Sequence, residues 1–291
     1  MPKVRKGRQT PTKSIVLPYA ETRGQEAIDL YNGSGRTAQE WQELLTYDIL
    51  AINTDGLWVH TKYGEEIPRR NGKNEVVVIR EMFGLPHGER ILHTAHRTTT
   101  STSAARRLAA RLVGAGYEEV ARIKKGEKYD KHFTYTKQLG MERIVLLGEG
   151  GGTIDFRTRS SSGGLGEGFD LLVIDEAQEY TDNQETALKY VVTDSKNPQT
   201  IFCGTPPTTV SAGTVFTKMR SAVLQGETTN TGWAEWSVDE MTDPGNKEAW
   251  YETNPSLGTI LTERAIQDEI GTDKIDFNIP VSYTHLTLPT T

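Results

Sequence analysis

The sequence predicts an α/β fold, a three-layer sandwich with a mostly parallel central sheet. Apolar runs of strand length at 90–96, 171–174 and 199–206 alternate with segments of helical spacing. Such continuous runs are typical of strands buried on both faces, which occur where helices cover a parallel sheet. The length of 291 residues suits one large domain of this class or two ordinary ones.

The periodicity of each segment gives the order of the elements. Thr37 is a candidate N-cap for the first helix, and the helix that follows residue 97 begins with hydroxyl residues and ends at glycines. We expect helices within 37–52, 65–85 (after a polar loop), 98–116, 182–195 and 214–226, and strands at 56–63, 90–96, 171–174 and 199–206. Residues 1–24 are basic and are expected to be flexible.

The segment 143–159 alternates in hydrophobicity and turns at Gly150–Gly152, which predicts a β-hairpin. The glycines could also suggest a phosphate cradle, but a cradle requires a helix directly afterwards, and residues 153–159 have the character of a strand. A glycine-rich loop at 160–170 then leads into the apolar run at 171–174.

Composition and charge exclude several classes of protein. Hydrophobic residues make up 35% of the chain, which supports a packed core, and no stretch approaches the length of a membrane span. There is no apolar signal-peptide core, and the single Cys203 excludes an intrachain disulfide framework and gives no metal cluster, so a reducing, cytoplasmic compartment is expected. The net charge of −6 argues against a wholly basic nucleic-acid binder but permits a local basic channel.

The run 171–174 ends in two adjacent carboxylates, Asp175 and Glu176. An Asp at the end of a buried strand can hold Mg²⁺, and the adjacent Glu can orient and deprotonate an attacking water. A strand that simply reaches the surface is the alternative. A second feature, about a hundred residues earlier, favours the functional interpretation.

This second feature is the loop 67–74, in which Gly72 and Lys73 precede a helical run. A phosphate-binding loop needs backbone N–H groups at a helix N-terminus and a lysine that reaches the phosphates. The loop departs from the strict G-x-x-x-x-G-K-[ST] pattern, because Ile67 occupies the first glycine position and Asn74 replaces the hydroxyl residue. Alone, it is better explained as a surface turn. A third strand end carries Thr205, whose hydroxyl could sense the γ-phosphate.

Together these segments resemble the ATPase half of the large terminase subunit of tailed bacteriophages, over roughly residues 25–279. The segment "IPRRNGKN" is similar to the deviant Walker A motif of that family, "LLVIDEAQ" to its Walker B motif with catalytic Glu, and "CGTPPT" to its coupling motif. "EWQELL" is similar to its adenine-recognising segment. The resemblance implies a P-loop NTPase fold of the RecA-like (ASCE) type.

The resemblance also implies a role for each matching residue. Lys73 and Glu176 would be catalytic, and Asp175 and Asn74 would hold Mg²⁺. The ATP-binding residues would be Gln42 (adenine), Arg69, Arg70, Asn71, Gly72, Lys73, Asn74 and Thr205, and Thr205 would couple hydrolysis to movement. Either arginine could instead act on the nucleotide of a neighbouring subunit. A basic helix face formed by Arg97, Arg106, Arg107 and Arg111 is a candidate surface for DNA, and a solvated helix face is the alternative.

The implied organisation is a flexible segment at 1–24, an ATPase domain at 25–260, the start of a linker at 261–280 and an adapter-like, non-native tail at 281–291. The family continues into a nuclease domain of RNase H-like fold, so nuclease activity is not expected from these residues. Implied partners are double-stranded DNA, a small terminase subunit, a portal protein and further copies in a ring, with no membrane. The implied location is the cytoplasm of an infected bacterial host.

Two other functions remain open from the residues alone. A helicase-like ATPase of the DEAD-box type also places Asp-Glu at a strand end, but it needs a second motor lobe. A nucleotide-binding assembly element without turnover would be consistent with Asn74 at the position where a metal-ligating hydroxyl is usual.

Overall fold

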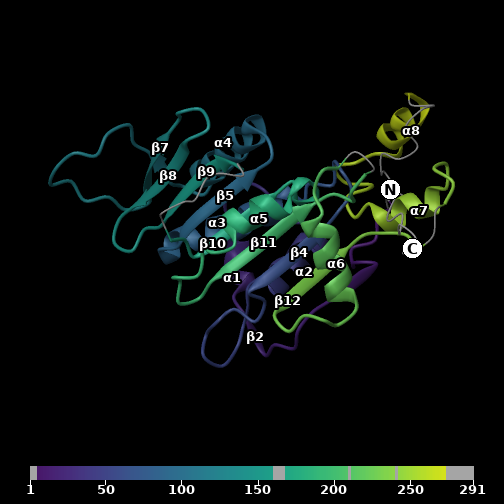
Figure 1. Cartoon of the computed structure of the whole chain (residues 1–291). Helices are drawn as coiled ribbons and strands as arrows, with labels where there is room; N and C mark the ends of the chain where they lie inside the picture. Colours follow the sequence, from purple (N-terminus) through teal and green to yellow (C-terminus); the bar gives the residue numbers. More distant parts are fainter. Residues whose placement is uncertain (1–4, 160–167, 209–210, 240–241, 273–291) are drawn as a thin grey trace.

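The structure is a computed structural model that describes residues 5–159, 168–208, 211–239 and 242–272. Within these residues the main feature is a ten-stranded mixed sheet in the order β1-β12-β4-β11-β10-β5-β9-β8-β7-β6 (Figure 1). The strands from β12 to β9 in this order are parallel to one another. The strands of this sheet are β1 (Lys13–Ile15), β4 (Lys62–Glu66), β5 (Arg90–Ala95), β6 (Glu118–Glu119), β7 (His132–Thr136), β8 (Glu142–Leu147), β9 (Thr153–Thr158), β10 (Leu171–Asp175), β11 (Gln199–Gly204) and β12 (Thr231–Glu235).

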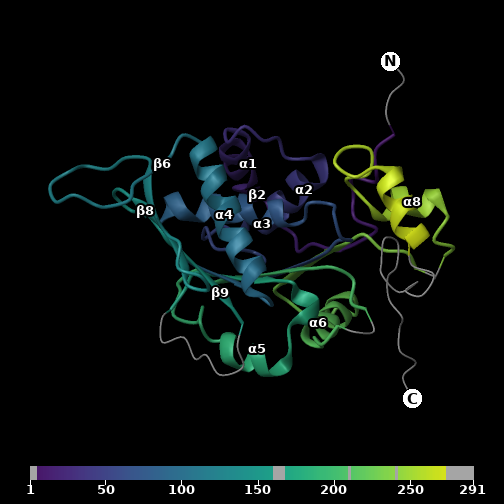
Figure 2. The same ribbon diagram turned by 90° about the horizontal axis from the view of Figure 1, so that it is seen from above.

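Helices cover both faces of this sheet, and α1 to α4 lie on the face opposite α5 and α6 (Figure 2). The helices are α1 (Gly24–Asn32), α2 (Glu40–Ile49), α3 (Asn74–Gly84), α4 (Thr98–Gly114), α5 (Asp182–Leu188), α6 (Val215–Leu224), α7 (Lys247–Thr253) and α8 (Glu263–Thr272). Short 3-10 helices follow α3 and β10 (η1, Leu85–His87; η2, Ala177–Glu179), and β2 (Glu21–Thr22) pairs with β3 (Ala51–Ile52). None of the helices in the described ranges is long and apolar enough to cross a membrane.

Each face of the sheet has its own apolar core. The larger core, under α1 to α4, includes the fully buried Trp41 and Phe83. The smaller core, under α5 and α6, includes Phe216 and Trp233. The predicted α/β sandwich with a mostly parallel central sheet is therefore confirmed.

The expectation of a flexible N-terminal segment is wrong for residues 5–24. Lys13–Ile15 form β1, which pairs antiparallel with β12 at the edge of the sheet. Arg8 reaches α7, where its guanidinium pairs with Glu252 at 2.8 Å and its backbone N–H donates to the carbonyl of Tyr251. The basic residues of this segment therefore serve at least partly to pair with an acidic helix.

The strand expected at 56–63 lies later, at Lys62–Glu66, and Trp58 forms only an isolated bridge with Ile52. Parallel pairing with β11 on one side and β12 on the other holds β4 in the centre of the sheet. As a result Glu65 and Glu66, which we expected in a polar loop, are buried. Sheet pairing overrides the polar sequence at this point.

Other boundaries differ by a few residues. The first helix of the prediction begins at Glu40 with Gln39 at its N-cap, so Thr37 does not cap it, and the helix expected at 182–195 ends at Leu188. The hairpin is confirmed, since β8 and β9 pair antiparallel. Most of the glycine-rich loop, residues 160–167, and the tail at 281–291 lie outside the described residues.

Candidate functional site

The loop between β4 and α3 has the backbone of a pre-formed anion site. It turns through Arg70 at φ 66° and Gly72 at φ 81°, and α3 begins at Asn74. Asn71 anchors the turn, because its buried carboxamide donates to Asn254 Oδ1 at 2.8 Å and accepts from the N–H of Ser256 at 3.0 Å. The free N–H groups at the start of α3 therefore face outward from a rigid loop, as phosphate binding requires.

A cavity of about 280 Å³ opens beside this loop. It is lined by Arg70, Gly72, Lys73, Asn74, Arg107 and Ile260, among others. Lys73 Nζ lies 3.4 Å from Asn74 Oδ1, the one hydrogen bond found for this ammonium group among the described residues. The cavity is thus bordered by cationic side chains and by the N-terminus of a helix.

The strand-end carboxylate meets the loop directly. Asn74 Nδ2 donates to Asp175 Oδ2 at 2.7 Å, and Asp175 is 1% exposed. Burial raises the pKa of Asp175, but the contact with His93 and the charge of Lys73 outweigh it and lower the pKa to about 2. Asp175 is therefore ionised at neutral pH, next to the two loop residues with which we expected it to act.

Behind Asp175 lies a buried chain of groups that the sequence analysis missed. His93 Nδ1, on β5, lies 2.6 Å from Glu81 Oε1 on α3, and His93 Nε2 lies 3.8 Å from Asp175 Oδ2. Burial lowers the pKa of His93, but the charges of Glu81 and Asp175 raise it to about 9. The run 90–96 contained a histidine at a position that faces α3, but a buried histidine in a strand is no signal by itself.

Glu176 has a left-handed backbone, φ 53° and ψ 49°, directly after β10. Its carboxylate accepts from the N–H of His96 at 3.0 Å and from Thr100 Oγ1 at 3.3 Å, at the start of α4. In this arrangement it lies against α4, one strand away from the Asn74–Asp175 contact, because β5 neighbours β10.

Thr205 lies where β11 reaches both other strand ends. The carbonyl of the preceding Gly204 accepts from the N–H of Ile67 at 3.1 Å, and the N–H of Thr205 donates to Gln178 Oε1 in η2 at 3.1 Å. The ends of β4, β10 and β11 therefore meet at one edge of the sheet. The three segments that the sequence analysis singled out are neighbours.

Gln42 and the two arginines of the loop already have partners or positions of their own. Gln42 is buried, accepts from the N–H of Gln39 and donates to the carbonyl of Gly72 at 3.2 Å, so it contacts the loop itself. Arg70 pairs with Glu269 of α8 at 2.7 Å. Arg69 is exposed.

The arginines of α4 do not form one free basic face. Arg107 and Arg111 both approach Glu75 of α3, with nitrogen–oxygen distances of 3.7 and 3.2 Å. Burial raises the pKa of Glu75, but its contacts with Arg111 and Tyr31 lower it below the usual range. Of the four arginines proposed for DNA, at least two are committed to an ion pair inside the protein.

Glu65 is a further group that the prediction placed in a loop. It lies level with Cys203 of β11, which lies level with Asp175 of β10, so the three side chains form one row across the sheet. Both carboxyl oxygens of Glu65 are buried without a hydrogen-bond partner, and burial raises its pKa to about 8. Glu65 is therefore neutral at pH 7, and Asp175 carries the charge of the row.

Comparison with solved structures identifies the fold. The chain superposes on the crystal structure of the HK97 bacteriophage large terminase with a TM-score of 0.69 and 14% identity, over 91% of this chain and 56% of that protein. The large terminase ATPase domain of Thermus phage P74-26 gives a TM-score of 0.43 at 14% identity, over 61% of this chain and 68% of that one. The large terminase of another thermophilic bacteriophage, in complex with ADP, gives 0.38 at 14% identity, over 50% and 34%.

No protein-family model and no curated protein sequence matches the chain. The chain spans 56% of the length of the HK97 protein, and at 14% identity the likeness concerns the fold. The predicted fold class, a RecA-like P-loop NTPase sandwich, is that of these structural neighbours and is confirmed.

Proposed function

We propose that the chain is the ATP-hydrolysing motor domain of a phage DNA-packaging terminase. The observation that carries the proposal is the 2.7 Å contact between Asn74 of the loop and Asp175 of β10, with Lys73 beside both. It joins a lysine, a helix N-terminus and an ionised carboxylate at the carboxyl edge of a parallel sheet, where ligands of such folds bind. The fold shared with the HK97 large terminase supports the same conclusion.

The donor set suits ATP with Mg²⁺. Lys73 and the N–H groups of residues 71–74 would hold the phosphates, and Asp175 and Asn74 would hold the metal, which neutralises phosphate charge when bound. Among the described residues no three His, Cys, Asp or Glu side chains form a metal site. Such sparse protein ligation is usual for Mg²⁺ bound together with substrate phosphates.

Glu176 would orient and deprotonate the attacking water. The water oxygen attacks the γ-phosphorus in line, the bond to the bridging oxygen of ADP breaks, and the proton passes to Glu176. Glu176 must turn away from His96 and Thr100 to do so, since its carboxylate is bonded to them here. Thr205, next to Gly204 and bonded to Gln178, would report loss of the γ-phosphate to the sheet edge, and Gln42 would read adenine.

The proposal is tested by ATP turnover and ATP binding in the wild type, Glu176→Gln and Lys73→Ala, with DNA present and oligomeric state controlled. We expect Glu176→Gln to bind ATP as the wild type does and to lose at least a hundredfold in kcat, since general-base catalysis contributes about 10²–10⁴-fold. Lys73→Ala should lose binding. The control is Glu227→Gln, whose carboxylate is exposed. Equal binding without turnover in wild type and Glu176→Gln would favour the nucleotide-binding assembly element.

The wider assignments are part of the same proposal. Double-stranded DNA, contacted through its phosphates, would be the translocated partner, and a small terminase subunit, a portal protein and further copies in a ring would be the others. Residues 25–260 would be the ATPase domain, 261–280 the start of a linker to a nuclease domain and 281–291 a non-native tail. Arg69 or Arg70 would contact phosphate in this subunit or its neighbour.

A further inference from the structure

Arg159, directly after β9, is a buried arginine that the proposed reaction leaves without a role. It is 6% exposed, and its guanidinium reaches from β9 past β5 to the end of β10. Nη1 donates to the carbonyls of Thr94 at 3.1 Å and Asp175 at 2.5 Å, and Nη2 donates to the carbonyl of Glu176 at 3.1 Å. One side chain therefore joins the backbone at the ends of β5 and β10.

The carbonyls that it binds belong to the residues proposed as metal ligand and base. Glu176 has a left-handed backbone, which residues other than glycine adopt rarely and keep only when their surroundings hold them. The two peptide oxygens on either side of this turn face one guanidinium. The planar fork of arginine suits this arrangement, because its donors have fixed directions that a lysine cannot reproduce.

The surroundings indicate that the charge of Arg159 is retained for this purpose. Burial lowers its pKa to about 10, against the opposing effect of Asp175 and Glu176, so it remains a cation at neutral pH. Its guanidinium carbon lies 5.5 Å from the ring centre of Tyr180. A buried cation without a carboxylate in a direct ion pair is costly, and here the described contacts of the guanidinium are carbonyls and a ring.

We propose that Arg159 is a positioning residue for the hydrolysis reaction: it fixes the left-handed turn that aims the carboxylate of Glu176. The inference rests on the proposed function, because it gives Arg159 a purpose only if Glu176 acts on the water. Arg159 contacts neither the loop 67–74 nor its cavity among the described contacts, so it acts through the backbone of Glu176.

The test compares Arg159→Lys and Arg159→Gln with the matched control Arg157→Lys, two residues earlier on the same strand and partly exposed. We expect both Arg159 variants to lose at least tenfold in kcat while KM and ATP binding stay within about twofold, and Arg157→Lys to behave as the wild type. In the Glu176→Gln background, Arg159→Lys should cause no further loss. Residues that act as a unit behave in this non-additive way.

Three results would overturn the inference. One is a wild-type kcat in both Arg159 variants, and another is an equal loss with and without Glu176. The third is loss of the cooperative unfolding transition in both variants while Arg157→Lys keeps it, which would assign Arg159 to the fold alone. Failure of the proposed function is distinguishable, because Glu176→Gln by itself would then turn over ATP normally.

Discussion

At the scale of the residue, the site separates charged from neutral acids within one row. Glu65 and Asp175 lie on either side of Cys203, yet burial without partners keeps Glu65 neutral, and His93, Lys73 and Asn74 keep Asp175 ionised. This difference provides one metal-binding carboxylate without a second like charge beside it. The motif predicted Asp175 and Lys73. It could not predict Glu65, since only the pairing of β4 determines which residues of 62–66 are buried.

The raised pKa of Glu65 predicts a dependence of stability on pH. Its pKa is about 8 in the fold and about 4.5 when unfolded, so its contribution to stability is fully present below pH 4.5 and is lost as the pH rises through 8. Glu65→Gln removes this loss. Between pH 5 and pH 8.5 we expect the wild type to lose on the order of 2–4 kcal/mol relative to Glu65→Gln, at about 1.4 kcal/mol per pH unit of titration.

Urea unfolding at the two pH values measures the difference. Glu227→Gln, at an exposed carboxylate, should show no change with pH relative to the wild type. A constant difference between wild type and Glu65→Gln across this range would mean that Glu65 is ionised in the fold.

At the scale of the element, the sequence predicted the strands that are apolar throughout and misplaced the one that is not. β5, β10 and β11 lie where the apolar runs are, because burial on both faces leaves no alternative. β4 has the sequence KYGEE, and its position was hidden because its polar side chains are tolerated only by the pairing on both sides. The 67–74 loop was nevertheless found, because glycine and lysine carry their own signal.

Gly64 explains how β4 fits between its neighbours. A Cβ at Gly64 would lie 2.4 Å from the ring of Trp233, which is fully buried on β12. We expect Gly64→Ala to lower the free energy of unfolding by about 1–3 kcal/mol, the usual cost of overpacking a core. Thermal or denaturant unfolding measures it.

Gly245→Ala is the control for this change, because the nearest atom to its Cβ lies at 3.4 Å and the residue is exposed. A Gly64→Ala protein as stable as the wild type would show that Trp233 can move aside, and that β4 is held less tightly than its burial indicates.

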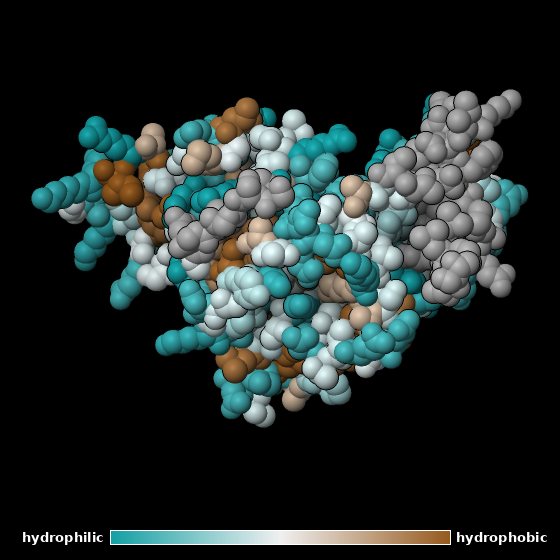
Figure 3. Space-filling model, viewed as in Figure 1, coloured by the Kyte–Doolittle hydropathy of each residue, from teal (hydrophilic) through white to brown (hydrophobic). Residues whose placement is uncertain are grey.

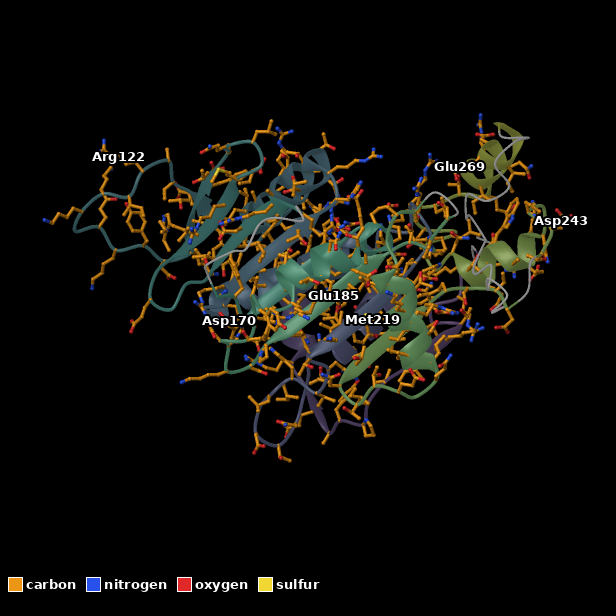
Figure 4. All side chains as sticks on the ribbon, viewed as in Figure 1. Arg122, Asp170, Glu185, Met219, Asp243 and Glu269 are labelled. Atoms are coloured by element: carbon orange, nitrogen blue, oxygen red, sulfur yellow. The ribbon has the colours of Figure 1, made fainter. Side chains whose placement is uncertain are left out.

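At the scale of the whole molecule, the charges are arranged differently from the sequence-based expectation. Of the two basic segments recognised in the sequence, at least part of each pairs with acidic residues of the protein, at α7 and at Glu75. A third basic segment went unnoticed, the exposed loop between β6 and β7. It projects from the body of the molecule with Arg122 near its end (Figure 4), at an end where hydrophilic side chains extend into solvent (Figure 3).

This loop is the surface on which a DNA partner can be tested most sharply. Residues 121–131 contain five basic and two acidic residues, and all but Tyr129 are exposed. Each phosphate contact that is lost should lower the slope of log affinity against log salt by about 0.9 for duplex DNA. Replacing Lys124, Lys125 and Lys128 by Gln should therefore weaken binding of duplex DNA at low salt and reduce this slope by about 1–3, uniformly across DNA sequences.

The matched control replaces the exposed Lys62, Lys189 and Lys196, which changes the net charge equally on other surfaces. A purely global charge effect would weaken DNA binding to the same degree in both triple variants and would remove the loop as the contact surface. ATP turnover without DNA should be the same in both, because neither set of lysines lines the cavity beside Lys73. Loss in the loop variant alone would connect the basic projection to the DNA while leaving the nucleotide site intact.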